Sequence, residues 1–322
     1  MNPTIKDVAK RAGVAVSTAS YALNKDERIK KETREKILKA AEELGYFPST
    51  AARMMKKKNS GVIGVFIISY SGPVVSVILD SLGKNLKRYN YDMLVISGSE
   101  SSFKFLKEKY IDGAIILDSL LPDETFTEKI NPSLPVLMLN RILEGKKIYT
   151  YTIENEELFY HLMLRLIKSG VKNPIFISGV EDTYDNIYRF KGFCRAIRQN
   201  GMELHYRKGD FEKKSGYTIA KKLFKEDVKY DAVVCANDEM ALGVIDALNE
   251  HGIKINEQVK VTGFDNIELA KYYKPSLTTI SVDRYSWGKL VAAQMVKIIN
   301  NKNAERHLTI GGEIIVRESA NI

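Results

Sequence analysis

The sequence predicts an all-α helix-turn-helix head followed by a larger α/β body with doubly wound parallel sheets. Apolar residues recur at helical spacing in three stretches of the first 47 residues. After Asn59-Ser60-Gly61 the pattern changes to short apolar runs that alternate with amphipathic stretches. The charge changes there too: residues 1–60 hold 14 Lys and Arg against 7 Asp and Glu, whereas the remaining residues carry a net charge of only +2. A basic head on a nearly neutral body indicates a localised contact with a polyanion.

The first helix of the head is expected to begin at Thr4. Thr4 offers an N-cap hydroxyl, Asp7 adds a carboxylate three residues later, and Val8 and Ala9 follow at helical spacing. Gly13 then supplies the permissive backbone of a tight turn. This helix and the next one therefore form the expected helix-turn-helix unit.

The second helix is expected to run from about Val16 to Asn24. Its apolar side chains should turn inward, and its polar side chains should face outward, where they are candidates for reading DNA bases. The inward set is Val16, Ala19 and Leu23, and the outward set is Ser17, Thr18 and Tyr21.

The third helix is expected from about Lys31 to Leu44, with Ile37, Ala40 and Ala41 on one face. Gly45 stands in the usual position for ending a helix. The three helices together can bury one small core.

The body is expected to hold strands and helices in alternation. Each strand candidate is a short, nearly continuous apolar run, as occurs when helices cover both faces of a parallel sheet. Strands are expected at residues 62–68, 93–96, 113–117, 136–139, 174–178, 232–235 and 260–263. Helices are expected near residues 76–89, 103–109, 156–169, 188–200, 215–226, 239–251 and 286–300. Because this strand total is large for one sheet, two sheets with a cleft between them are expected.

Polar and aromatic side chains fall just past several strand ends, where such a cleft would be lined. Asn140, Asn237 and Asp265 follow strands, Phe211 follows a Gly-Asp pair, and Arg189 is expected to open a helix. Amides, a carboxylate and a guanidinium supply the donors and acceptors that a polyhydroxyl ligand requires, and an aromatic ring packs well against a sugar face.

An enzyme is not expected. The four histidines, at positions 161, 205, 251 and 307, lack metal-ligand spacing, and no Gly-x-Ser-x-Gly or phosphate-loop pattern is present. We therefore expect no cofactor and no metal. Cys194 and Cys235 are expected to be reduced core thiols, which fits a reducing compartment. Without an export signal or a run long enough to span a bilayer, the protein is expected in the cytoplasm, associated with the nucleoid and not with a membrane.

Motifs in the head and hinge are specific in combination. They are Thr4-Ile5-Lys6-Asp7-Val8-Ala9, Gly13-Val14, Ser17-Thr18-Ala19-Ser20, Asn24, Thr33-Arg34, Leu44-Gly45-Tyr46 and the segment from Pro48 to Met55. The pattern continues through the body to Val316-Arg317-Glu318-Ser319. Over essentially the whole chain, the sequence resembles the LacI/GalR family of bacterial transcription regulators.

The resemblance implies a domain organisation and a function. Residues 1–47 would be the DNA-binding head, 48–59 a hinge helix or linker, and 60–322 a two-lobed effector-binding and dimerisation domain of the periplasmic-binding-protein-like type (type I). Lobe one would hold about residues 60–157 and 283–312, and lobe two about residues 158–282 and 313–322. The protein is then expected to be a repressor that binds a palindromic double-stranded DNA operator as a homodimer and responds to a small-molecule effector.

Two heads about one helical turn apart would read an inverted repeat in the major groove. The segment 49–57 is too short to be a stable helix by itself, so it should fold only when paired on DNA, with Met55 as a wedge in the minor groove. Lys56, Lys57 and Lys58 would contact phosphates. The residues expected to contact DNA are Thr4, Val16, Ser17, Thr18, Tyr21, Asn24, Arg53 and Met55.

Four residues depart from the family pattern. Ala15 stands where many members have a serine that caps the recognition helix, and Met55 where a leucine usually forms the wedge. Tyr21 stands where arginine is frequent, and a phenol cannot read guanine in the bidentate way of a guanidinium. Asn140 stands where many members have aspartate, and an amide donates as well as accepts.

The resemblance also implies the effector contacts. It favours ligand contact over helix capping for Asn237 and Asp265, whereas capping is favoured for Asp238. The effector is expected to be a sugar or sugar derivative that acts as an inducer by changing the angle between the lobes and separating the hinges. A corepressor is the alternative. The expected contact residues are Ser69, Asn140, Arg189, Phe211, Asn237 and Asp265.

Two other functions stay open at this point. One is a global regulator of the same family whose corepressor is a phosphocarrier protein, and the other is a cytosolic sugar-binding protein. Activation instead of repression also stays open. Because no heptad repeat follows the last strand, a dimer is expected rather than a tetramer.

Overall fold

The computed structural model describes residues 3–24, 26–47, 59–67, 72–97, 100–117, 128, 130–223, 225–226 and 229–322. The chain forms two compact units, Met1–Ser60 and Gly61–Ile322. The predicted hinge contacts Arg53, Met55 and Lys56 to Lys58, and the predicted effector contact Ser69, lie outside the described residues. None of the helices within these ranges combines the length and the apolar character needed to cross a bilayer.

The head contains the three predicted helices, α1 (Ile5–Ala12), α2 (Val16–Leu23) and α3 (Lys31–Glu43). The Asp7 carboxylate closes the first turn of α1, because it accepts hydrogen bonds from the Thr4 backbone N–H at 2.8 Å and the Thr4 hydroxyl at 2.7 Å. The hydrogen bonds from Thr4 also lower the pKa of Asp7.

Alanine side chains make up most of the head core, so the three helices approach one another closely. Gly13, at φ 64°, forms the turn between α1 and α2. The prediction that Val16 turns inward is wrong: its side chain is 43% exposed, and Ala22 is buried instead. Side chains lean toward the helix N-terminus, so Val16, at the first position of α2, projects beyond the helix contact. The buried residues are Val8, Ala9, Ala12, Ala19, Ala22, Ile37, Ala40 and Ala41.

One sheet of the body has the strand order β11-β5-β4-β3-β1-β2, and all its neighbouring strands are parallel. We call this sheet and its helices lobe 1. Its strands are β1 (Val62–Ile67), β2 (Asp92–Ser97), β3 (Gly113–Ile116), β4 (Val136–Leu139), β5 (Ile148–Ile153) and β11 (His307–Ile310). Its helices are α5 (Pro73–Arg88), the 3-10 turn η1 (Glu100–Phe103), α6 (Lys104–Lys107) and α13 (Arg284–Ile299).

The second sheet has the order β12-β10-β9-β8-β6-β7, and only β12 is antiparallel to its neighbour. We call this sheet and its helices lobe 2. Its strands are β6 (Pro174–Ser178), β7 (His205–Lys208), β8 (Ala232–Cys235), β9 (Lys260–Phe264), β10 (Thr278–Ser281) and β12 (Glu313–Ile315). Its helices are α8 (Asn155–Lys168), α9 (Tyr184–Gln199), α10 (Lys213–Leu223), α11 (Asp238–Glu250) and α12 (Leu269–Tyr272).

The predicted fold class is confirmed, with a helical head and two doubly wound sheets. All seven predicted strands are present, and the sequence missed β5, β7, β10, β11 and β12. β7 and β11 are not continuous apolar runs, because their residues alternate between half-buried and exposed. The central strands of lobe 1 are buried on both faces: Ile63 and Val65 of β1 contact one core, while Phe66 of the same strand contacts another.

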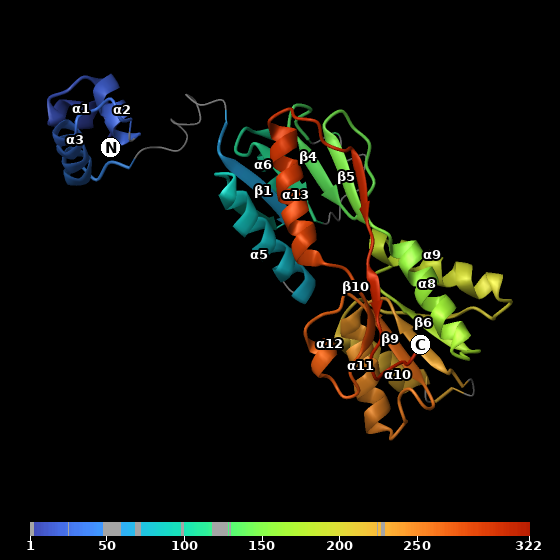
Figure 1. Cartoon of the computed structure of the whole chain (residues 1–322). Helices are drawn as coiled ribbons and strands as arrows, with labels where there is room; N and C mark the ends of the chain where they lie inside the picture. The colour runs from blue at the N-terminus through green and yellow to red at the C-terminus, as the bar shows by residue number, and fades with distance from the viewer. Residues whose placement is uncertain are drawn as a thin grey trace. The chain divides into compact units, whose positions relative to one another are not determined.

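The chain passes between the two sheets three times, after β5, after β10 and after β11. In Figure 1, α5 lies beside α13 in lobe 1, and α8 lies beside α9 in lobe 2. Each lobe is therefore built from segments that are distant in the sequence. Cys235 is buried, as predicted, whereas Cys194 is only partly buried, and both are free thiols.

Candidate functional site

The two sheets have the same strand order. In each sheet, the point at which this order reverses indicates where a ligand would bind. β2-β1-β3-β4-β5 in lobe 1 matches β7-β6-β8-β9-β10 in lobe 2. The order reverses at β1 and β3 in the first sheet and at β6 and β8 in the second. Ligands of such sheets bind outside the carboxyl ends of the strands at this point. The described residues just after β6 and β8, and those just after the neighbouring strands β4 and β9, are therefore the first candidates.

Asn140, directly after β4, joins the two lobes. Its Nδ2 donates to Asp185 Oδ2 in the first turn of α9 at 3.1 Å. The other oxygen of Asp185 accepts from Asn155 Nδ2 at 2.8 Å. The Asn140 Oδ1 atom is buried and has no hydrogen-bond partner among the described residues. The Asn140 side chain thus bridges the lobes through its Nδ2 atom, while its buried Oδ1 atom accepts no hydrogen bond from the described residues.

Arg189 lies inside α9 and does not open it, because the helix begins five residues earlier, at Tyr184. Its side chain is 3% exposed. Its Nε donates to Asn155 Oδ1 at 2.9 Å, its Nη1 donates to the Ala236 carbonyl at 2.7 Å, and its guanidinium lies 3.8 Å from the centre of the Phe264 ring. Burial lowers the pKa of Arg189. The guanidinium therefore fixes α9 to the ends of β8 and β9.

Asp265, directly after β9, makes a second bridge between the lobes. Its Oδ1 accepts from Nη2 of Arg284, the first residue of α13, at 2.7 Å. Both side chains are nearly buried. Asp265 does not cap a helix, since α12 begins only at Leu269. The loss of solvent around this pair strengthens the attraction between the two charges.

Contrary to the expectation from the sequence, Asn237 caps α11. Its backbone is extended, its Oδ1 accepts from the Met240 N–H at 3.1 Å, and its Nδ2 donates to the Phe211 carbonyl at 2.8 Å. The Phe211 ring fills the space beside Gly179, where a Cβ would lie 2.0 Å from a ring carbon. Asn237 and Phe211 thus hold each other at the ends of β8 and β7.

The prediction that Asp238 caps α11 is wrong. The helix begins at Asp238, so the capping position belongs to the residue before it. The Asp238 carboxylate is fully buried and accepts hydrogen bonds from the Ile267 N–H at 2.9 Å and the Thr279 hydroxyl at 2.5 Å. Gly263 leaves room for it, since a Cβ there would lie 2.3 Å from its Oδ1.

Backbone strain is concentrated at the same edge. Seven described residues other than glycine have positive φ, and four of them follow strand ends between the lobes. Such conformations cost free energy and are enriched at binding sites. The four are Asn140 (φ 53°), Phe211 (φ 71°), Asp265 (φ 114°) and Asn266 (φ 53°). We call these residues, together with Asn155, Asp185, Arg189 and Arg284, the interlobe junction.

In the head, α2 presents a second candidate surface. Val16, Ser17 and Tyr21 are exposed on one side of the helix, and the Tyr21 ring is 45% exposed. Arg28 lies 4.8 Å from the centre of that ring and pairs with Asp26, whose pKa its guanidinium lowers to about 2. An exposed helix with hydroxyl and phenol groups, next to a fixed guanidinium, can contact both base edges and phosphates.

The comparisons with known proteins cover both units of the chain. Residues 4–49 match the model of bacterial regulatory proteins of the lacI family, and residues 164–320 match a periplasmic binding protein-like domain. The transcriptional regulator RegA of Clostridium saccharobutylicum is 30% identical over 333 residues, which cover 99% of each chain. The transcriptional repressor PurR of Pasteurella multocida is 29% identical over 327 residues and 98% of each chain.

This chain belongs to the LacI family. Among solved structures, it is similar to a sugar-binding transcriptional regulator of this family from Enterococcus faecalis, with 29% identity, a TM-score of 0.74, and 81% of this chain and 98% of that one covered. Its fold is also that of the lac repressor dimer bound to operator and an anti-inducer, with a TM-score of 0.84, 23% identity and 99% of each chain covered. The LacI-family chain is therefore a DNA-binding transcriptional regulator and not an enzyme, as predicted.

The structure of this chain places five of the six predicted effector residues at the strand ends between the lobes. Asn140, Arg189, Phe211, Asn237 and Asp265 all lie at or against strand ends between the lobes. Sequence reasoning missed three residues that hold them there: Asn155, Asp185 and Arg284. Asp185 stands four residues before Arg189, a helical ion-pair spacing that could have indicated it.

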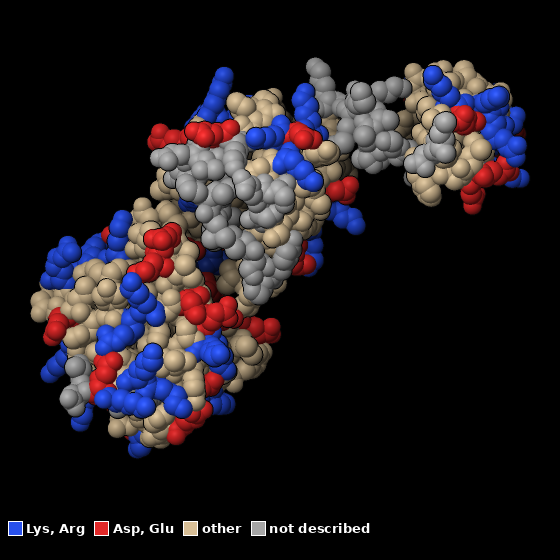
Figure 2. All heavy atoms as spheres, turned by 180° about the vertical axis from the view of Figure 1, so that it is seen from behind, with Lys and Arg blue, Asp and Glu red and all other residues tan. Residues whose placement is uncertain are grey.

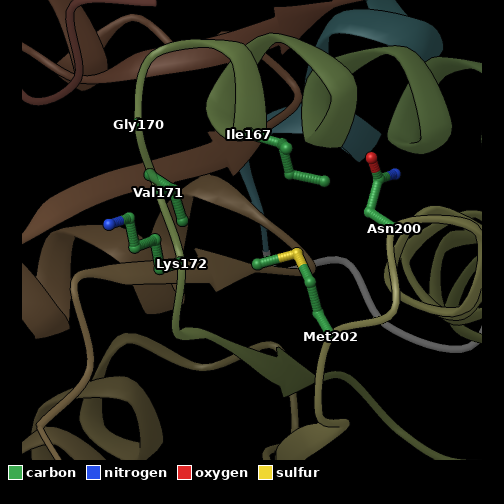
Figure 3. A pocket seen from close by; sticks show the side chains of 6 residues that line it. All are labelled: Ile167, Gly170, Val171, Lys172, Asn200 and Met202. Atoms are coloured by element: carbon green, nitrogen blue, oxygen red, sulfur yellow. The ribbon is translucent and has the colours of Figure 1, made fainter.

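A hollow elsewhere in lobe 2 is separate from this junction. Its volume is about 310 Å³. Figure 3 shows its lining side chains near the last turns of α8 and α9. Its lining residues precede β6 and β7, so it lies at the amino ends of these strands and not at the carboxyl ends. It is lined by Ile167, Gly170, Val171, Lys172, Asn200 and Met202.

We expect Asp238 to make the stability of the body depend on pH. Burial, with the neighbouring Asp265 charge, raises the pKa of Asp238 to about 7. The unfolded chain loses this proton near about pH 4. Between about pH 4 and 7 the folded state therefore binds more protons than the unfolded state, so the free energy of unfolding falls as pH rises.

Asp238→Asn should remove this dependence, because the amide is neutral and can still accept from Ile267 N–H and donate to Thr279. At pH 8 the variant should be more stable than the parent by about 1 to 3 kcal/mol, and near about pH 4 the two should be similar. Urea unfolding at a series of pH values measures this difference. Parallel profiles for the two proteins would contradict the expectation.

Proposed function

We propose that the chain is a sequence-specific transcriptional repressor that binds a palindromic operator as a homodimer, with its affinity set by a small carbohydrate effector between the lobes. Residues 1–47 would bind the operator, 48–59 would form the hinge, and 60–322 would bind the effector and dimerise. The protein would act in the cytoplasm, on the nucleoid. The exposed face of α2, on a head with a net charge of +7 over residues 1–60, carries this proposal.

In the proposed complex, α2 lies in the major groove with Val16, Ser17 and Tyr21 toward the bases. Thr4 is exposed at the start of α1, where backbone N–H groups favour a phosphate. The remaining contacts of the head and hinge keep the roles predicted from the sequence, with Met55 as the minor-groove wedge. These contacts are Thr18, Asn24, Arg53, Met55 and the lysines at 56, 57 and 58.

In the body, the charge distribution does not favour a second DNA surface. Lys and Arg side chains are intermingled with Asp and Glu over the face of the body that Figure 2 displays. Residues 61–322 carry a net charge of only +2. Operator binding is therefore assigned to the head and hinge alone.

A carbohydrate effector is supported by the chemistry of the junction. Its buried amide, carboxylate and guanidinium groups can exchange hydrogen bonds with hydroxyl groups. The Enterococcus faecalis regulator with 29% identity is described as sugar-binding. The proposed effector contacts are Ser69, Asn140, Arg189, Phe211, Asn237 and Asp265. An effector that breaks the Asn140 and Asp265 bridges would change the lobe angle and separate the hinges, so we propose an inducer.

A homodimer is supported by apolar side chains that α5 and β2 leave exposed. Val77 of α5 is 42% exposed, Tyr89, directly after the helix, is 45% exposed, and Leu94 of the edge strand β2 is 38% exposed. A second copy of the chain would cover them. Sedimentation equilibrium should give twice the chain mass, and a Val77→Asp variant should lower it toward one chain mass.

Selection from random duplex DNA tests the operator proposal. The full chain is incubated with the library at moderate salt, and the retained fraction is sequenced. A short palindrome with a defined centre is the expected result. A variant with Ser17→Ala and Tyr21→Ala should lose that palindrome while its circular dichroism is unchanged. Retention that depends on salt but not on sequence would contradict the proposal.

Titration of the selected operator complex with saccharides tests the effector proposal. An inducer lowers operator affinity, by roughly 5- to 150-fold for a typical coupling between two sites. A ligand that raises operator affinity would identify a corepressor and reverse the proposed sign. No effect of any saccharide on operator binding would contradict carbohydrate control.

A further inference from the structure

The first turn of α13 places two side chains at the interlobe junction that the proposed effector contacts do not include. Arg284 is 7% exposed and Trp287 is 3% exposed. They stand three residues apart and therefore on one side of the helix. The Arg284 guanidinium lies 5.6 Å from the centre of the Trp287 ring. The two residues form one buried unit that carries several hydrogen-bond donors.

The backbone of this turn is held in a fixed position. Asp283 caps α13, because its Oδ1 accepts from the Ser286 N–H at 2.9 Å. The Ser81 hydroxyl of α5 donates to the Tyr285 carbonyl at 2.6 Å. Gly288 allows close contact with α5, since a Cβ there would lie 2.8 Å from the Ser81 side chain. Arg284 and Trp287 are therefore presented on a rigid element, as a selective site requires.

Each of the two side chains has a donor with no partner. Nε of Arg284 and Nε1 of Trp287 are buried and make no hydrogen bond with the described residues. In the same lobe, Oδ1 of Asn140 is a buried acceptor that also lacks a hydrogen-bond partner among the described residues. Buried polar groups are nearly always hydrogen-bonded, because leaving them unpaired costs free energy. Two donors and one acceptor without partners indicate a ligand that can both accept and donate.

The charges of the junction indicate that this ligand is neutral. Arg284 is paired with Asp265 at 2.7 Å, and Nη2 of Arg189 lies 3.6 Å from Asp185. Asp238 adds a further carboxyl beside Asp265. Arg317 also borders the junction, where its Nη2 donates to Asn266 Oδ1 at 2.6 Å and its charge interacts with that of Asp238. The three guanidinium groups are thus matched by the carboxyl groups of Asp185, Asp238 and Asp265, so the junction offers no excess positive charge to a phosphate or a carboxylate ligand. Hydroxyl groups, which accept and donate without charge, fit this arrangement.

We propose that Arg284 and Trp287 select the effector by donating hydrogen bonds from Nε and Nε1 to oxygen atoms of a neutral saccharide, and that they discriminate against its phosphorylated form. This inference rests on the proposed effector site between the lobes. It adds two specificity residues to that site and restricts its ligand class. Because Nη2 of Arg284 pairs with Asp265 before the ligand binds, a ligand on Nε of the same guanidinium would act directly on the bridge between the lobes.

The chain offers a direct readout, because Trp287 is its only tryptophan. Tryptophan emission therefore reports on this residue alone. The probes are glucose, galactose, maltose and cellobiose, with glucose 6-phosphate and galactose 6-phosphate as charged counterparts, added to the full chain. A saturable change in emission with at least one neutral saccharide, at concentrations where its phosphorylated counterpart has no effect, is the expected result.

Conservative variants test each donor. Trp287→Phe keeps an aromatic ring but removes Nε1–H, and Arg284→Lys keeps the charge that faces Asp265 but removes Nε–H. Each should weaken binding of the active saccharide about tenfold, measured by calorimetry. Tyr285→Phe, on the exposed side of the same turn, is the matched control and should leave the affinity unchanged. Thermal melting without ligand establishes that all three variants are folded.

The possible failures are distinguishable. A saccharide that changes operator affinity but binds Trp287→Phe and Arg284→Lys as it binds the parent would overturn this inference and leave the proposed function standing. Tighter binding of the phosphorylated sugars would overturn the assignment of a neutral ligand. If no probe changes emission, melting or operator affinity, carbohydrate control itself is wrong and the inference falls with it.

Discussion

Arg189→Ala should lower the free energy of unfolding of the body by about 3 to 5 kcal/mol, the usual consequence of removing one partner from a buried ionic network. Arg189 is 3% exposed and bonds the Asn155 side chain and the Ala236 carbonyl. The substitution leaves both acceptors without this donor and removes the guanidinium that lies over the Phe264 ring. It also removes the positive charge that is paired with Asp185. Few single substitutions in this chain should cost more.

Arg198→Ala is the matched control for this experiment. Arg198 lies on the same helix but is exposed, so its loss should change the free energy of unfolding by less than about 0.5 kcal/mol. Denaturant unfolding of the parent and both variants, followed by circular dichroism, measures the differences. Equal stability of the two variants would show that the Arg189 network contributes nothing to the fold of lobe 2, contrary to its hydrogen bonds and burial.

Tyr21→Arg should change the base that the head prefers at one position in each half of the operator. The side chain is exposed on α2, and a guanidinium there can donate two hydrogen bonds to guanine, which a phenol cannot do. We expect guanine to be favoured by about 1 to 3 kcal/mol per half-site, or about 5- to 150-fold. Parallel selections from random duplex DNA with the parent and the variant measure this preference.

The added charge needs its own control, because any new cation on the head strengthens binding to phosphates. Leu38→Arg introduces the same charge at an exposed position of α3. It should raise affinity for all sequences equally and leave base preference unchanged. If Tyr21→Arg and Leu38→Arg select the same operators as the parent, α2 does not read bases through Tyr21.

The sequence predicted those strands and helices whose burial produces a local pattern of apolar residues. The strands β3, β4, β6 and β8 are continuous apolar runs, and a helix pattern follows or precedes each of them. β7 and β11 were missed because their residues, His205–Lys208 and His307–Ile310, include polar side chains and form no continuous apolar run. The short helix α12 was missed because four residues are too few for a periodic pattern.

The candidate site could be predicted only in part. Asn140, Asn237 and Asp265 were found because each follows a strand, and strand ends can be read from the chain. Their long-range pairing could not be predicted, since Asp185 accepts from an amide 45 residues away and Arg284 donates to a carboxylate 19 residues away. The wrong assignment of capping to Asp238 has the same origin, because Asn237 and Asp238 have equal capping tendencies and only the exact helix start separates them.

By itself the sequence determined the helical head, the alternating α/β body and the family, since periodicity, charge and motifs are properties of neighbouring residues. The tertiary structure decided how the polar residues of the body are used. Arg189 and Asn237 hold strand ends in place, Asp238 is buried, and Asn140 and Asp265 join the lobes. The physical reason is that the burial and pairing of a polar side chain depend on which distant segments come into contact, and the pattern of neighbouring residues does not predict those contacts.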